Sequence, residues 1–142
     1  MLILFSFSAS ANTPRSTGKY KNWESFTVET DKGKICFAQT LPTKRAPSSI
    51  QRGKSKLFVT FRPSENIENE VSLTSGHNFK SSTVTASSGK KRFSFFSQKD
   101  FAWLLDNQEE QNFIKLMKRA TNLIVKAKKI KGAETTDHYS MM

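Results

Sequence analysis

The chain has 142 residues and carries 23 Lys and Arg side chains against 12 Asp and Glu side chains, which gives a formal net charge of +11. A chain of this length supports one hydrophobic core, so we expect a single domain, and the single cysteine, Cys36, excludes an internal disulfide. The positive charge favours association with polyanions and anionic surfaces, although a solvated surface without a specific ligand explains it equally well.

The first eleven residues have the pattern of a secretory signal peptide. Residues 2–7 form an apolar run, and Ala9 and Ala11 place small side chains three and one before a cut, as signal peptidase requires. We therefore expect cleavage between Ala11 and Asn12 and export of the mature protein. The apolar run is short and no Lys or Arg precedes it, so we expect the signal peptide to be truncated at its start. The alternative is a disordered apolar N-terminus on a cytosolic protein.

Residues 12–21 are polar, contain Pro14 and Gly18 and lack apolar periodicity, which predicts a flexible lead-in. One domain over residues 22–142 follows, and it is rich in Phe and β-branched side chains, which favour strands. Residues 41–53 predict a long loop. Alternating apolar side chains predict strands, in chain order, at residues 23–29, 35–40, 57–61, 70–75, 84–86, 92–96, 101–105, 122–128 and 134–140.

The strand at residues 57–61 has large apolar side chains on both faces, so we expect it to be central and covered on both sides. The apolar period changes near residues 107–120 and predicts one amphipathic helix. Asp106 or Asn107 can cap this helix, and Glu109 stands three residues after Asp106, as in a capping box. The elements together predict a mainly β fold, an immunoglobulin-like β-sandwich built around its phenylalanines, with that single helix.

The residue types needed for metal binding or nucleophilic catalysis form no recognisable pattern. His77, His138 and Cys36 lie far apart and lack metal-ligand spacing. Residues 52–55 end like a phosphate-binding loop but lack its upstream glycine and following helix. We therefore expect no catalytic site, metal or cofactor. Cys36 lies in an alternating strand, where a buried, inert thiol is expected; an exposed thiol that pairs with a partner is the alternative.

Basic side chains gather around the long loop and at a hairpin tip, and loops presented by a rigid sandwich commonly carry function. Phe93 and Phe95 interleave with the second group, as in platforms for single-stranded nucleic acid, but their alternation fits core positions better, and we expect no nucleic-acid partner. The predicted basic binding surface comprises Lys44, Arg45, Arg52, Lys54 and Lys56 around the loop, and Lys90, Lys91 and Arg92 at the hairpin.

Several short segments are together fairly specific in order and spacing, although no single one is diagnostic. They are WESFT at residues 23–27, KICFA at 34–38, PTK at 42–44, RG at 52–53, VTFRP at 59–63, Trp103, MKRA at 117–120 and ETTDHYS at 134–140. Over nearly the whole mature chain they resemble the invasion-associated locus B proteins of alphaproteobacteria. The resemblance implies a small exported β-sandwich protein, named for a part in host-cell entry, and it supplies no catalytic residues.

Charge and resemblance together predict a non-enzymatic envelope protein, periplasmic or secreted to the cell surface of a Gram-negative bacterium. We expect it to bind an anionic envelope component or a partner protein through its basic loops. A structural or chaperone-like periplasmic module without a polyanion ligand is the first alternative, and a hydrolase of unrecognised geometry is the second. No stretch reaches the roughly 18 consecutive apolar residues of a membrane helix, so we expect no transmembrane segment, while peripheral membrane contact is compatible with the charge.

Overall fold

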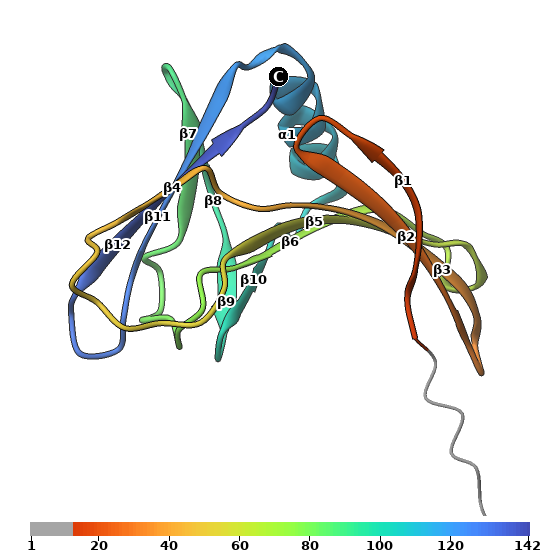
Figure 1. Ribbon diagram of the computed structural model, residues 1–142, viewed down its shortest axis with the longest axis horizontal. Helices are drawn as coiled ribbons and strands as arrows, with labels where there is room; N and C mark the ends of the chain where they lie inside the picture. Colours follow the sequence, from red (N-terminus) through yellow and green to blue (C-terminus); the bar gives the residue numbers. More distant parts are fainter. Residues whose placement is uncertain (1–12) are drawn as a thin grey trace, which may run out of the picture.

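The computed structural model describes residues 13–142, so the predicted cleavage site lies outside the described residues. These residues form two antiparallel sheets and one α-helix (Figure 1). In spatial order the first sheet contains β1 (Arg15–Tyr20), β2 (Trp23–Thr30), β3 (Gly33–Thr40), β5 (Lys56–Arg62), β6 (Ile67–Thr74), β10 (Phe101–Trp103) and β9 (Phe96–Gln98). The second contains β4 (Lys44–Ala46), β12 (Glu134–Ser140), β11 (Asn122–Lys128), β7 (Thr85–Ser88) and β8 (Lys91–Ser94).

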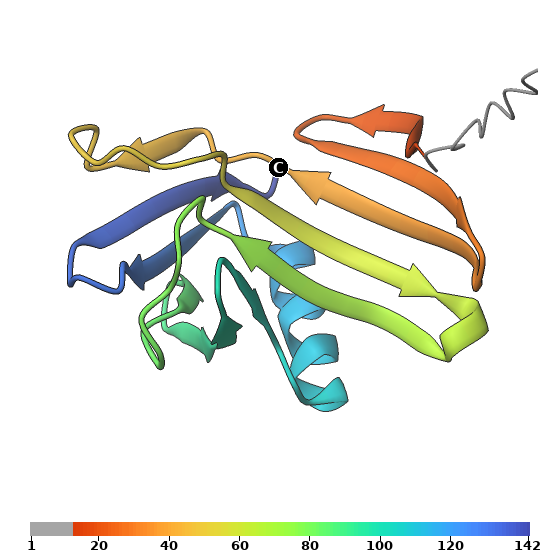
Figure 2. The same cartoon turned by 90° about the horizontal axis from the view of Figure 1, so that it is seen from below.

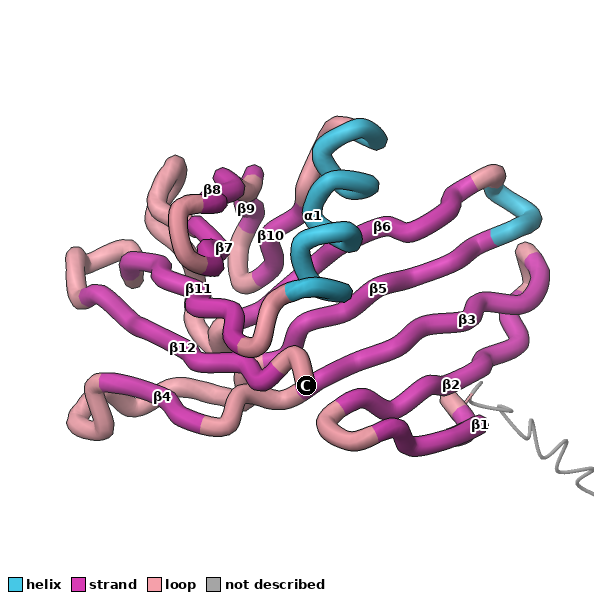
Figure 3. The backbone as a smooth tube through the Cα atoms, turned by 90° about the horizontal axis from the view of Figure 1, so that it is seen from above, coloured by secondary structure: helices cyan, strands magenta, loops and turns pink. Residues whose placement is uncertain are grey.

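The predicted β-sandwich with one helix is confirmed. Long strands β2, β3, β5 and β6 run side by side in the first sheet (Figure 2), and α1 (Asn107–Arg119) lies over the inner face of this sheet near β6 (Figure 3). The inner faces of both sheets and the helix supply one core. Its members include Leu57, Val71 and Leu73 of the first sheet, Leu123, Val125 and Tyr139 of the second, and Phe113 and Met117 of α1.

The helix forms where its capping signal predicts it. Asp106 has extended backbone geometry, and its carboxylate accepts a hydrogen bond of 2.7 Å from the Gln108 amide, which satisfies a free donor of the first turn. Glu109 and Glu110 occupy the first turn, where the helix dipole favours negative charge. The Glu110 carboxylate also accepts a 2.7 Å hydrogen bond from the Val71 amide, so this side chain joins the start of α1 to β6.

Two strands lie in segments predicted to lack regular structure. Instead of a flexible lead-in, residues 15–20 form edge strand β1, which pairs with β2, and the Ser16 hydroxyl donates to the Glu24 carboxylate at 2.7 Å. Within the predicted loop, β4 pairs with β12 through residues such as Arg45 and Asp137. Both are edge strands with mainly exposed side chains, so backbone pairing holds them and no apolar alternation marks them in the sequence.

The strand at residues 57–61 is central, as predicted, between β3 and β6. Its expected cover on both faces is wrong. Leu57 is fully buried on the inner face, whereas Phe58 on the outer face is only half-buried. The phenylalanines are also divided between the core and the outer face. Phe79, Phe95 and Phe113 are buried in the core, whereas others line the outer face of the first sheet. Alternation marks two faces of a strand without saying which one is covered.

Candidate functional site

The structure divides the predicted basic surface into separate parts. Lys44 and Arg45 are exposed on β4, whereas Lys90, Lys91 and Arg92 are exposed at the turn and start of β8. Strands β4 and β8 are the opposite edges of the five-stranded sheet, so the two groups do not form one patch.

Lys54 and Lys56, the other two lysines of the predicted loop surface, lie apart from both groups. Lys54 is exposed and Lys56 is half-buried, and both line a shallow depression beside β5 together with Phe58, Phe101 and Asp100. An acidic side chain therefore accompanies these two cations. The long loop does not supply a purely cationic site.

The Arg52 side chain is buried, which corrects its assignment to the basic binding surface. Its side chain is only 3% exposed and forms an ion pair with the buried carboxylate of Asp137, at 2.7 Å between Nη2 and Oδ1. A second bond of 3.0 Å joins Nη1 to Oδ2, and Nη1 also donates to the Ser75 carbonyl at 3.0 Å. The sequence around Arg52 does not reveal the carboxylate of Asp137 on β12, so a local pattern cannot distinguish this buried guanidinium from the exposed lysines beside it.

Of the hairpin cations, Lys91 meets a second set of cations, whereas Lys90 and Arg92 do not. A groove of about 380 Å³ lies between β8 and α1. Ligand sites in proteins commonly begin near this volume. The groove lining, which we call the helix–hairpin groove, consists of Lys91 and Phe93 from β8 and Asn112, Lys115, Leu116 and Arg119 from α1.

Secondary structure alone explains why these side chains share one surface. Asn112, Lys115, Leu116 and Arg119 follow the i, i+3, i+4, i+7 spacing that places helical side chains on one face. Lys91 and Phe93 are two apart on a strand, so they point to the same side. The neighbouring helix face holds buried Phe113, which packs edge-on against Phe93 with ring centroids 5.2 Å apart and fixes this wall of the groove.

The groove combines an apolar floor with a cationic rim. Phe93 and Leu116 are half-buried and pack against the core, while Lys91, Lys115 and Arg119 are exposed around them. No acidic side chain of the described residues lines the groove. The salt bridges found in residues 13–142 use other cations, Lys32, Arg45, Arg52 and Arg62. The three rim cations are therefore available to an anionic ligand.

Sequence reasoning found Lys91 but missed Lys115 and Arg119. The sequence predicts an amphipathic helix at residues 107–120 but assigns no binding role to its cations. The sequence does indicate that these two cations share a helix face with Asn112, because the three residues have helical spacing. This polar face lies beside the apolar face of the helix. Contact of that stripe with β8 is a tertiary feature, which no local pattern predicts.

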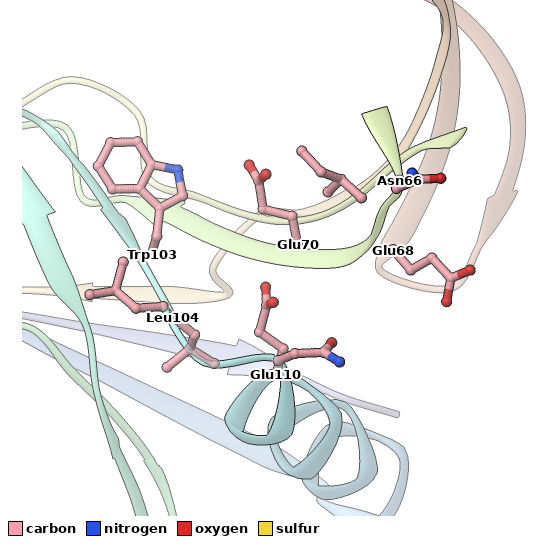
Figure 4. A pocket seen from close by; sticks show the side chains of 9 residues that line it. Asn66, Glu68, Glu70, Trp103, Leu104 and Glu110 are labelled. Atoms are coloured by element: carbon pink, nitrogen blue, oxygen red, sulfur yellow. The ribbon is translucent and has the colours of Figure 1, made fainter. Parts of the chain in front are cut away.

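A pocket of opposite charge lies where α1 begins (Figure 4). It has a volume of about 440 Å³ and is lined by Glu68, Glu70, Glu110 and Trp103, among others. Burial raises the pKa of Glu110, the hydrogen bond from Val71 opposes this, and the charges of Glu70 and Asp106 raise the pKa further. The positive charge of the protein is thus unevenly distributed, and an anionic ligand is repelled from this pocket.

The two histidines and the cysteine do not come together in a site. His77 is buried, with Nε2 2.9 Å from the Thr135 hydroxyl and Nδ1 3.0 Å from the Asn78 carbonyl, and burial lowers its pKa. His138 lies on β12 opposite Lys44. Cys36 is a free thiol of intermediate exposure, less buried than expected. Across the described part of the chain, no group of three or more His, Cys, Asp or Glu side chains is placed to hold a metal ion.

Comparison of the chain with protein-family models, with curated proteins and with solved structures gives no match. No helix between residues 13 and 142 combines the length and apolar character of a membrane span.

Proposed function

We propose that this chain is a non-enzymatic, exported envelope protein of the invasion-associated locus B type, and that it binds a phosphate-bearing amphiphile of the envelope in the helix–hairpin groove. The observation that carries the proposal is the set of three unpaired cations, Lys91, Lys115 and Arg119, around an apolar floor. The family resemblance supports export and an envelope location.

The two parts of the groove suit the two parts of such a ligand. Cations on the rim attract the phosphate, and the guanidinium of Arg119 can donate two parallel hydrogen bonds to it. Phe93 and Leu116 remove apolar carbon from water, which adds affinity that salt does not screen. A phosphate without an apolar part therefore binds more weakly and with a steeper salt dependence than an amphiphile.

Binding of the mature chain to lipid vesicles tests the electrostatic part. We expect cosedimentation with phosphatidylglycerol vesicles at low salt, a decline as salt increases, and no cosedimentation with phosphatidylcholine vesicles. The double substitution Lys115→Gln with Arg119→Gln should weaken binding about thirtyfold, because each cation at an anionic surface contributes about 1 kcal/mol. The matched control is Lys118→Gln with Lys126→Gln, which removes equal charge from exposed positions outside the groove.

Two results would contradict the proposal. Absence of binding at low salt would leave the structural or chaperone-like module as the better hypothesis. Equal losses in the groove variant and in its control would show that the general positive field, and not this groove, attracts the vesicles.

A soluble probe tests the apolar floor separately. Dodecyl phosphate below its micelle concentration should bind more tightly than inorganic phosphate, and Leu116→Ser should reduce that difference while leaving inorganic phosphate binding unchanged. Leu116 is half-buried and lies on the helix surface, so this variant should fold. Equal affinity for the two probes would show that the site recognises phosphate alone.

A further inference from the structure

The outer face of the seven-stranded sheet carries five aromatic side chains in a continuous line. Phe26 stacks on Phe37 with ring centroids 5.1 Å apart, and the line continues through Phe58 to Phe101 and Trp103 at separations of 6.0, 6.2 and 6.1 Å. It crosses strands β2, β3, β5 and β10. We call these five residues the aromatic row.

Strand register fixes the row on the face opposite the core. Phe26 pairs with Phe37, and Ser72 pairs with both Phe58 and Trp103, so these side chains share a face. Their immediate neighbours in the chain point the other way. Leu57 beside Phe58, and Ala102 between Phe101 and Trp103, are fully buried in the core. Helix α1 lies on the inner side of this sheet, next to β6 (Figure 1). The register places the row on the opposite face.

The row borders a shallow groove of about 450 Å³ that continues the apolar surface through Val28 and Ile35. The charged residues that line it are Arg62 and Glu70, whose side chains lie 3.8 Å apart and compensate each other. Where one face of an antiparallel sheet meets solvent, polar side chains normally alternate with the core residues. A contiguous apolar face on a protein otherwise rich in charge marks an interaction surface.

Charge decides which partner fits this surface. An anionic ligand finds no unpaired cation in the groove beside the row, whereas the helix–hairpin groove offers three. Two copies of a chain with net charge +11 repel each other over most of their surfaces. The groove beside the row is balanced by Arg62 and Glu70 and lacks that penalty. Lys54 and Lys56 border the row only at Phe58 and Phe101, where Asp100 compensates one of them. A second copy presents the same aromatic surface to this groove.

We propose that two copies of this chain associate through the aromatic row, sheet face against sheet face. A two-fold interface brings identical patches together, and sheets pack face to face at about 10 Å when their facing side chains are apolar. Aromatic side chains are enriched in such interfaces. The inference rests on the register and charge of the first sheet and is independent of the ligand proposed for the helix–hairpin groove.

Salt should act on this association in the opposite direction to ligand binding. Screening reduces repulsion between the two cationic copies, while apolar contact is not screened, so added salt favours the dimer. Binding of an anionic ligand is weakened by the same change.

Sedimentation equilibrium of the mature chain over a range of concentrations tests the proposal. We expect a reversible dimer whose fraction rises from low to high salt. Phe58→Ser and Phe101→Ser should each weaken association about tenfold or more, as truncation of a central aromatic contact does. The matched control is Ile130→Ser, because Ile130 is 63% exposed and lies between β11 and β12, away from the row.

Fluorescence keeps the test informative if those variants fold poorly. In a Trp23→Phe background, emission from Trp103 should shift to shorter wavelength as protein concentration rises, because the indole loses contact with water. A monomer at all concentrations and salt levels would overturn the proposal. So would a dimer weakened by Ile130→Ser and not by the row variants, or a monomer whose Trp103 emission responds to phosphatidylcholine vesicles, which would identify a membrane as the occupant.

Discussion

Arg52 and Asp137 form a bidentate ion pair that joins the loop before β5 to the second sheet. They are 85 residues apart in the chain, and both side chains are almost fully buried, at 3% and 1% exposure. The Ser55 hydroxyl and the Ser75 carbonyl accept further hydrogen bonds from the same guanidinium nitrogen, at 3.2 and 3.0 Å. The pair therefore fixes three segments that meet at one end of the sandwich.

Arg52→Met should lower the free energy of unfolding by about 3 to 5 kcal/mol, because it leaves the Asp137 carboxylate buried without its main partner. Arg45, whose Nε lies 3.8 Å from the same carboxylate, can compensate only in part. Urea unfolding measures the loss. Lys54→Met removes an equal charge from an exposed position of the same loop and should change stability by less than about 0.5 kcal/mol. Similar losses in both variants would show that the ion pair is not a stabilising contact.

Gly76 has a left-handed backbone, with φ of 77°, and a Cβ added there would lie 2.1 Å from the Gly53 carbonyl oxygen. The Gly53 amide donates to the Gly76 carbonyl at 2.8 Å, so the two segments cannot separate without breaking this bond. Gly76→Ala should therefore cost more than about 2 kcal/mol in urea unfolding. Gly89→Ala is the control, since φ is 57° but nothing lies within 4 Å, and strain alone should cost about 1 kcal/mol. Equal costs would exclude the close approach as the cause.

Local patterns predicted the elements that bury a regular apolar stripe. Strands β11 and β12 have the predicted bounds, and α1 begins after its Asp106 cap. Edge strands β1 and β4 were missed because they bury little. Pairing of β4 with β12 connects segments some ninety residues apart, and no local rule relates them.

The candidate sites show the same limit. The sequence indicated Lys91 as exposed and basic, but the meeting of Lys115 and Arg119 with β8 depends on how the helix packs. The sequence also predicted a surface position for Arg52. Its buried partner Asp137 lies on another sheet, and the residues near position 52 do not indicate it. Alternation detected strands at Phe26 and Phe58 without telling which of their faces meets the core.

The Tyr139 hydroxyl is buried and has no hydrogen-bond partner among the described residues. Burial raises the pKa of this phenol, so the group remains neutral. Tyr139→Phe removes the unsatisfied hydroxyl and keeps the ring, so the free energy of unfolding should rise by about 1 kcal/mol. Tyr20→Phe, at an exposed edge position, should leave stability unchanged. A loss of stability in Tyr139→Phe would mean that the hydroxyl is hydrogen-bonded in solution, for example to a buried water.

Buried His77 should make the protein sensitive to mild acid. Burial lowers its pKa below the usual 6.5, as do the charges of Arg52 and Lys129, while the Asn78 carbonyl and Asp137 act in the other direction. The unfolded chain therefore binds a proton more readily than the folded one, and stability is lost as pH falls below about 6.5.

Glutamine does not titrate, so His77→Gln removes the side chain that binds a proton. The urea midpoint of this variant should therefore depend less on pH between about 7.5 and about 5.5. The amide can still bond to the Thr135 hydroxyl, which His77 Nε2 contacts at 2.9 Å. His138→Gln on the outer face of β12 is the matched control, and it should keep the acid sensitivity of the natural protein. If the control loses that sensitivity and His77→Gln retains it, then His77 is not the group that titrates, because these are the two histidines of the chain.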